Sequence, residues 1–177
     1  MHIDKALRFL LFLLFLTMLV GALKLLNWLP SIIEKGTLEK HASVEELRSR
    51  FPNEKIYLPS YFPRNLEWPP LRIVAQRKPY VAIMMYFSDR NTGKVGLSLQ
   101  QLSAGISPPP PSEMRIARPV RKSSVLIRER EGTLVTALCE ESVPCYQISW
   151  REGNFTLTLT TTVSQRDLIR MATSMVP

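Results

Sequence analysis

The sequence YVAIMMYFSDRNTGKVGLSLQQL, residues 80–102, predicts the clearest hairpin in this 177-residue chain. Residues 80–88 form an apolar run without alternation, so we expect a strand that is buried on both faces. Residues 89–93 end in Gly93, and a glycine suits the positive φ of a hairpin loop. Residues 94–102 then alternate apolar and polar side chains, which predicts the returning strand. Such a strand pair requires a helix over one face, and a loop, a partner or the membrane over the other.

Further strands and a closing helix flank this hairpin. After the hairpin, the next two predicted strands are residues 125–130 and 133–139, and Gly132 lies in the turn between them. Ser164 is typical of a helix N-cap, and Leu168, Ala172 and Met175 recur on one face of the helix that follows. This helix is therefore expected to lie on the sheet. The further strands are predicted at residues 71–76, 125–130, 133–139, 145–151 and 154–162.

Residues 56–70 combine four prolines with a dense group of apolar side chains. The prolines exclude a regular helix or a central strand. A segment of this kind either packs over the edge of a core or forms an aromatic rim around a ligand. Candidates for lining such a ligand groove are Phe62, Trp68, Met84 and Met85, since methionine adapts to irregular ligands. The same four residues also fit a packed core.

Positive charge accumulates in the second half of the chain. The net charge is +8, and from residue 61 onward there are 15 Lys and Arg against 9 Asp and Glu. The excess is densest in residues 115–130, which follow four prolines at residues 108–111. We expect solvated strand ends and loops there, or a surface for an anionic lipid or an acidic protein. The basic residues concerned are Arg115, Arg118, Arg121, Lys122, Arg128 and Arg130.

Cys139 and Cys145 end one predicted strand and begin the next. Facing positions at a hairpin end bring Cα atoms within the ~4.4–6.8 Å that a disulfide needs. The count is even and no third thiol competes, which predicts a structural disulfide that contributes on the order of 2 kcal/mol. The spacing does not fit a C-x-x-C redox motif, and the two histidines lie outside the domain, so no metal site is expected.

The N-terminal sequence ALRFLLFLLFLTMLVGALKLLNWL, residues 6–29, predicts a single transmembrane anchor. With Lys24 snorkelling, it reaches the ~20 residues that cross ~30 Å of hydrocarbon. A cleaved signal peptide is disfavoured because no A-x-A-like site follows, and a buried core helix because the chain is too small to surround it. The residues assigned to the anchor are Phe9, Leu13, Leu16, Leu23 and Trp28.

The orientation of this anchor depends on the cysteines. Lys5 and Arg8 precede the span, which favours a cytoplasmic N-terminus, but three lysines follow it. A disulfide requires an oxidising compartment, and this places the folded part outside the cytoplasm.

Three parts of the chain are therefore expected. Residues 1–30 form the anchor, residues 31–55 a stalk, and residues 56–177 an extracytoplasmic domain. The stalk contains a short solvated helix at residues 44–50, which begins at a Ser43–Glu46 capping box. The predicted fold class is α+β, with an N-terminal transmembrane helix and a mostly antiparallel β-sheet on which a C-terminal helix packs.

The C-terminal third carries a recognisable order of elements. A strand YQISW (146–150) is followed by REGN (151–154), a second strand (155–162), and Ser164, Leu168, Ala172 and Ser174 at helical spacing. The earlier LPSYFP at residues 58–63 also fits this order. The pattern resembles a bacterial family of extracytoplasmic domains of unknown function, found C-terminal to the transmembrane helix of anti-sigma factors and related envelope proteins. The resemblance implies an antiparallel sheet with a packed helix and a non-enzymatic envelope role. It does not carry over an anti-sigma function, because about eight residues precede the span.

No residue set for catalysis is apparent. Residues 56–177 contain no histidine, which excludes Ser-His and Cys-His pairs, and glycine-rich phosphate loops are missing. We therefore expect neither an enzyme nor a cofactor, and nucleic acid is an unsuitable partner outside the cytoplasm. The sequence predicts a single-pass protein of the bacterial inner (cytoplasmic) membrane, with its domain in the periplasm or outside. It would be an accessory or scaffold protein that binds another envelope protein or membrane complex. The alternative is a lipid or lipoprotein carrier or sensor with an apolar groove.

Overall fold

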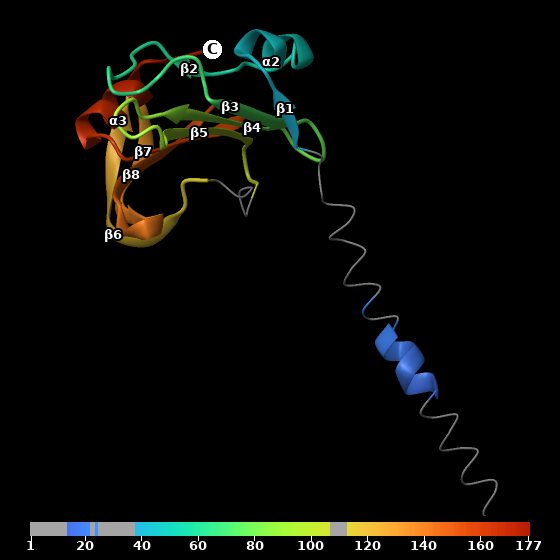
Figure 1. Ribbon diagram of the computed structural model, residues 1–177. Helices are drawn as coiled ribbons and strands as arrows, with labels where there is room; N and C mark the ends of the chain where they lie inside the picture. Colours follow the sequence, from blue (N-terminus) through green and yellow to red (C-terminus); the bar gives the residue numbers. More distant parts are fainter. Residues whose placement is uncertain (1–13, 22–23, 25–37, 107–112) are drawn as a thin grey trace, which may run out of the picture. The chain divides into compact units, whose positions relative to one another are not determined.

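The structure is a computed structural model that describes residues 14–21, 24, 38–106 and 113–177. The chain divides into two compact units, Met1–Thr37 and Leu38–Pro177. The described part of the first unit is a helix over residues 14–21, drawn in blue in Figure 1. Its large apolar side chains are 46–74 % exposed.

The predicted anchor falls largely outside the described residues. This is the case for Phe9, Leu13, Leu23 and Trp28, whereas Leu16 is described and is 46 % exposed. Among the helices that the structure describes, none combines the length and the apolar character needed to cross a membrane.

The second unit is built on one eight-stranded antiparallel sheet in the order β1-β3-β4-β5-β9-β8-β7-β6. A small second sheet pairs β10 with β2. The predicted α+β class, with its mostly antiparallel sheet and C-terminal helix, is confirmed for this unit. The elements are β1 (Glu39–His41), α2 (Val44–Arg50), β2 (Leu58–Pro59), β3 (Arg72–Gln76), β4 (Ala82–Ser88), β5 (Val95–Ser103), β6 (Ile116–Ile127), β7 (Arg130–Cys139), the 3₁₀ turn η1 (Glu140–Ser142), β8 (Pro144–Glu152), β9 (Phe155–Thr161), α3 (Gln165–Thr173) and β10 (Met175–Val176).

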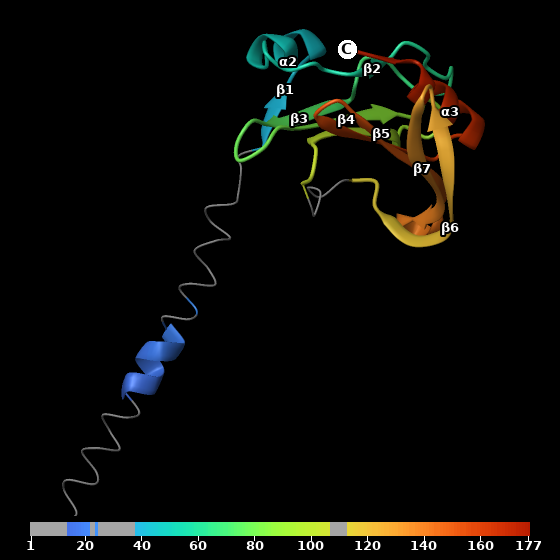
Figure 2. The same ribbon diagram turned by 180° about the vertical axis from the view of Figure 1, so that it is seen from behind.

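Two antiparallel meanders meet in the middle of this sheet. The strands β3, β4 and β5 form one, and β6 to β9 form the other. They join where β5 pairs with β9, with Leu99 opposite Leu159. Figures 1 and 2 show that β6, β7 and β8 run steeply away from β3, β4 and β5, so the sheet is strongly bent.

The hairpin of β4 and β5 forms the centre of the core, and β4 is buried over its whole length, as predicted. Ile83, Met85 and Phe87 point to one face and belong to the main hydrophobic cluster. Leu47 of α2 and Leu168 of α3 belong to the same cluster. Helices therefore cover this face of the sheet.

The opposite face of β4 carries Met84 and Tyr86, which are 2 % and 3 % exposed. The described end of the connection from β5 to β6, residues 113–115, lies on the side of the sheet opposite to α2 and β2 (Figures 1 and 2). Glu113 of this connection forms an ion pair with Arg72 of β3. The Arg72 guanidinium in turn lies 4.7 Å from the centre of the Tyr86 ring. Arg72 and Glu113 thus cover part of the second face of the apolar strand.

The helix α2 spans the predicted residues, and the Ser43 side chain accepts a hydrogen bond from the Glu46 N–H at 3.1 Å. The N–H of Ala42 donates to Glu46 Oε2 at 2.8 Å, and this bond holds the pKa of Glu46 below its usual value. The prediction that this helix is solvated stalk is wrong. Val44 and Leu47 are 4 % and 0 % exposed, and the compact unit begins at Leu38. Apolar burial therefore makes α2 part of the domain.

The turn between β6 and β7 also differs from the prediction. It lies at Arg128 and Glu129, and Arg128 has a φ of +56°. Gly132 is instead buried within β7, opposite Trp150. A Cβ on Gly132 would lie 3.3 Å from the Trp150 Cβ, so a larger residue here would require the neighbouring strand to shift by a few tenths of an ångström.

Candidate functional site

The strand β6 forms one edge of the large sheet, because β7 is its single neighbour among the described strands. The opposite edge is β1, which has three residues, whereas β6 has twelve. A long edge strand presents a row of unpaired N–H and C=O groups, and proteins protect such a row or use it for binding.

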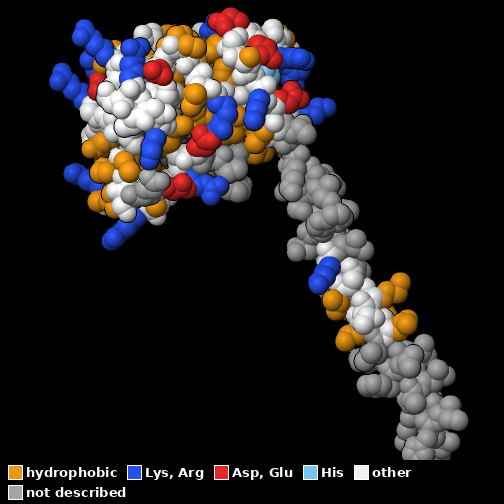
Figure 3. All heavy atoms as spheres, viewed as in Figure 1, with side chains coloured by type: hydrophobic (Ala, Val, Ile, Leu, Met, Phe, Trp, Pro, Cys, Tyr) orange, Lys and Arg blue, Asp and Glu red, His pale blue; other side chains and the backbone are white. Residues whose placement is uncertain are grey.

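Most of β6 is open to solvent. Every residue from Ala117 to Lys122 is exposed. Val120 and Leu126 are large apolar residues, yet they are 66 % and 67 % exposed. Figure 3 shows Lys and Arg side chains in blue among hydrophobic side chains in orange on the part of the surface where Figure 1 places β6.

The six basic residues that the sequence singles out divide into two groups. Arg118, Arg121 and Lys122 lie on β6, and Arg115 precedes it. Within the described chain, none of these four side chains has a hydrogen-bond or carboxylate partner. They form a free basic group, which we call the β6 basic cluster.

The other two basic residues have structural roles. Arg128 Nε donates to the carbonyl of Thr173 at 2.9 Å, and its Nη2 donates to the carbonyl of Met175. It thus places positive charge at the C-terminal end of α3, where the helix dipole favours it. Arg130 pairs with Glu152 at 2.9 Å. Both residues fasten the β6–β7 turn to its surroundings.

The hydrogen-bonding direction along β6 follows from this turn. Two residues separate the paired Ile127 and Arg130, and in such a hairpin the flanking pair exchanges both backbone hydrogen bonds. Hydrogen-bonded and non-hydrogen-bonded pairs alternate from there. The N–H and C=O groups of Lys122, Ser124 and Leu126 therefore point to the open edge.

The two halves of β6 differ in their suitability for another strand. The first half contains Pro119 and two irregularities of register, between Ile116 and Arg118 and between Pro119 and Arg121. Proline and bulges are devices that protect an edge from pairing. From Arg121 to Ile127 the register is regular and proline is missing. The open edge of residues 122–126 is therefore available for strand addition.

A shallow hollow of about 300 Å³ lies on this half of β6. It is lined by Ser124, Val125, Leu126 and Glu131. The Ser124 hydroxyl donates to Glu131 Oε1 at 2.7 Å, which fixes the carboxylate on β7. The exposed Leu126 side chain can contact an apolar group here.

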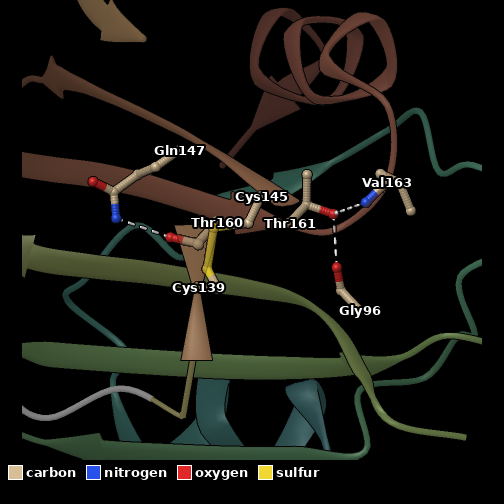
Figure 4. Close-up of a disulfide and its surroundings, with 7 residues drawn as sticks. All are labelled: Gly96, Cys139, Cys145, Gln147, Thr160, Thr161 and Val163. Atoms are coloured by element: carbon tan, nitrogen blue, oxygen red, sulfur yellow. Dashed lines mark hydrogen bonds between the residues drawn. A yellow bond between two sulfur atoms is a disulfide. The ribbon is translucent and has the colours of Figure 1, made fainter. Parts of the chain in front are cut away.

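Cys139 and Cys145 form the predicted disulfide, with their Cα atoms 5.8 Å apart (Figure 4). Both are buried with Ala137 in a small cluster separate from the main core. Cys139 lies opposite Ile116, the first residue of β6. The disulfide therefore braces the sheet where the edge strand begins.

A larger hollow of about 670 Å³ lies beside this disulfide. Its lining includes Lys94, Glu113, Arg115, Cys139 and Glu140, so it carries both signs of charge. Within the described chain, no group of three or more His, Cys, Asp or Glu side chains could hold a metal ion.

The four residues proposed for an apolar ligand groove do not meet in one place. Met84 and Met85 are adjacent in β4, so they point to opposite faces, and both are at most 2 % exposed. Phe62 and Trp68 contact each other and Phe87. The centre of the Phe62 ring lies 6.0 Å from that of Trp68 and 4.9 Å from that of Phe87. Trp68 is 51 % exposed, so this aromatic group forms the rim of the core.

The edge strand itself was missed in the sequence. The prediction begins this strand at residue 125 and expects solvated strand ends and loops over residues 115–130, but β6 begins at Ile116. Proline and Lys or Arg within an extended segment are the signature of an edge strand, and this was the available signal.

Fold and site together define an α+β domain with one bent antiparallel sheet, a covering helix and an open basic edge. Comparison with protein-family models, with curated proteins and with solved structures finds no match to this chain. The resemblance to extracytoplasmic domains of envelope proteins stays a prediction.

Proposed function

We propose that this chain is a membrane-tethered, non-catalytic accessory protein of a bacterial envelope, which binds another envelope protein through the open edge of β6. The observation that carries the proposal is the regular stretch of residues 122–126, with outward backbone groups beside the β6 basic cluster, whose side chains have no carboxylate partner among the described residues. An edge of this kind gives a partner backbone hydrogen bonds for affinity and side chains for specificity.

The tether is supported by residues 6–29. The described helix over residues 14–21 exposes Leu14, Phe15, Leu16, Met18, Leu19 and Val20, each by 46 % or more. A helix that is apolar all round requires burial in protein or in lipid. We propose that it belongs to a single-pass anchor in the inner membrane.

The compartment is supported by the disulfide. Disulfides persist in oxidising compartments and are rare in the cytoplasm. We therefore propose that the domain lies in the periplasm or outside the cell. Alkylation of the native protein before and after reduction tests this: thiols that react before reduction would overturn the placement.

The test of the function is affinity purification of the tagged full-length chain from its native membrane in mild detergent, with mass spectrometry of the bound proteins. Two forms are compared, the natural chain and Ser124→Pro, in which the outward N–H is removed from an edge position that tolerates proline. We expect a stoichiometric partner with the natural chain and its loss with Ser124→Pro. A chain that purifies alone, or a partner that both forms retain, would overturn the proposal.

A further inference from the structure

We infer that β6 binds an extended, acidic segment of a partner protein, which adds to the sheet as a further strand. This inference rests on the function proposed above and specifies the chemistry of the partner. It depends on two properties of the same strand, an open row of backbone groups and a positive charge that no carboxylate of the described residues neutralises.

The backbone row requires another polypeptide. Lys122, Ser124 and Leu126 direct N–H and C=O groups outward at alternate positions, and only a strand in the same register pairs all of them. An anionic lipid surface attracts positive charge, but it does not offer a matching row of hydrogen-bond donors and acceptors. The observations therefore favour a peptide over a membrane.

The positive charge of β6 determines which sign of charge the partner peptide carries. Arg118, Arg121 and Lys122 are exposed and, in the described chain, without a carboxylate partner. Opposite charges across an interface attract and raise the association rate. The occupant is therefore acidic.

The side chains of β6 also indicate a spacing in the partner. Lys122 and Leu126 lie on the same face of the strand, four residues apart, which is about 13 Å. Residues directly opposite them on an added strand have the same separation. The partner segment is expected to carry an acidic residue and an apolar residue four positions apart, facing Lys122 and the exposed Leu126.

The probe is a fluorescent synthetic peptide with a Glu and a Leu four positions apart in a Thr and Val background. Binding to the full chain in uncharged detergent is measured by anisotropy. A second peptide has Lys in place of Glu. Two further peptides carry N-methyl groups on alternate residues, one on the odd and one on the even positions. Strand addition predicts that one N-methyl set abolishes binding while the other leaves it, because alternate N–H groups face β6.

Variants of the chain separate charge from backbone pairing. Replacing Arg118, Arg121 and Lys122 together by Gln is expected to lower the affinity for the Glu peptide about tenfold at low salt. The matched control removes three exposed arginines elsewhere, Arg64, Arg90 and Arg166, by the same substitution. Ser124→Pro is expected to abolish binding, and Ser124→Ala, which keeps the N–H, to retain most of it. Circular dichroism confirms that each variant is folded.

Several outcomes would overturn the inference. These are equal binding of the Glu and Lys peptides, equal effects of both N-methyl sets, or equal losses in the two triple variants. Binding of phosphatidylglycerol vesicles without peptide binding would assign the cluster to lipid, and dimerisation that Ser124→Pro abolishes would assign the edge to a second copy.

The inference and the proposed function fail in different ways. If Ser124→Pro loses the native partner but the triple Gln variant keeps it, the acidic chemistry is wrong and the edge-binding function stands. If both variants keep the native partner, the function itself is wrong.

Discussion

The two hairpins β4–β5 and β6–β7 show opposite ways of specifying a strand. All of β4 is buried, whereas β6 is exposed from Ala117 to Lys122. The first hairpin is determined by its own apolar residues, which need cover on both faces. The second is held by its turn, its disulfide and its contact with α3. Burial thus determines the core of this domain, and a few specific contacts, such as that of Arg128 with Thr173, hold the edge that we propose as a binding surface.

The largest expected effect lies in the buried hairpin. Phe87 is 0 % exposed and contacts the Phe62 and Trp68 rings. Phe87→Ala is expected to lower the free energy of unfolding by about 3–5 kcal/mol, because it removes apolar contacts and leaves a cavity. Val120→Ala on β6 is expected to stay within about 0.5 kcal/mol. Guanidinium unfolding of the full chain in detergent, followed by circular dichroism, measures both, and equal losses would contradict the comparison.

A smaller effect is expected from proline at two adjacent positions of β6. Ser123 directs its N–H to β7 and Ser124 directs its N–H to the open edge. Ser123→Pro is expected to cost on the order of 2 kcal/mol, because it breaks a ladder hydrogen bond. Ser124→Pro is expected to cost less than about 1 kcal/mol. The same unfolding experiment measures both losses. A larger loss for Ser124→Pro than for Ser123→Pro would show that the outward N–H groups of β6 have been assigned to the wrong residues.

The turn of β6 provides a third test at Arg128. Its side chain bonds to α3, while its backbone adopts a φ of +56°. This left-handed conformation costs a residue other than glycine about 1–2 kcal/mol. Arg128→Ala loses the hydrogen bonds and keeps the unfavourable φ, whereas Arg128→Gly loses the bonds and relieves it. Alanine is therefore expected to be less stable than glycine by about 1 kcal/mol. Equal melting temperatures of the two variants would show that φ has no influence there.

The sequence predicted the buried part of the fold well, for a physical reason. A continuous apolar run located β4, apolar alternation and turn residues located β5, β8 and β9, and the Ser43 and Ser164 caps located α2 and α3. The paired cysteines predicted the disulfide. These signals are local, because each pattern lies within one short segment of the sequence.

The candidate site was predicted only as a list of residues. The basic side chains were recognised, but their separation into free and fastened groups depends on contacts between distant parts of the chain, such as Arg128 with Thr173. The order of strands places β6 at an edge, and this order depends on the pairing of β5 with β9. Proline and basic residues within β6 indicate an edge strand, but the pairing of β5 with β9 and the contact of Arg128 with Thr173 leave no pattern in the sequence of β6 itself.

The smallest expected effect concerns the other end of α3, where Asp167 fastens the helix to the segment after β2. Asp167 accepts hydrogen bonds from the Ser164 hydroxyl and from the Tyr61 hydroxyl, both at 2.8 Å. These two bonds hold the pKa of Asp167 below its usual value. A carboxyl whose pKa is lower in the folded state stabilises the fold above its unfolded pKa, and this contribution is lost as the pH falls through the folded pKa.

Asp167→Asn therefore removes a pH-dependent contribution, expected to be below about 1 kcal/mol because the site is partly solvated. The variant should be slightly less stable than the natural chain at neutral pH, and the difference should shrink on acidification below the usual pKa of an aspartate. Unfolding of both forms at a series of pH values measures this. Since Arg128 fastens the C-terminal end of α3 without a carboxylate, Arg128→Ala should show a loss that does not change over the same pH range. Parallel pH curves for Asp167→Asn and the natural chain would show that the Asp167 bonds do not contribute to stability.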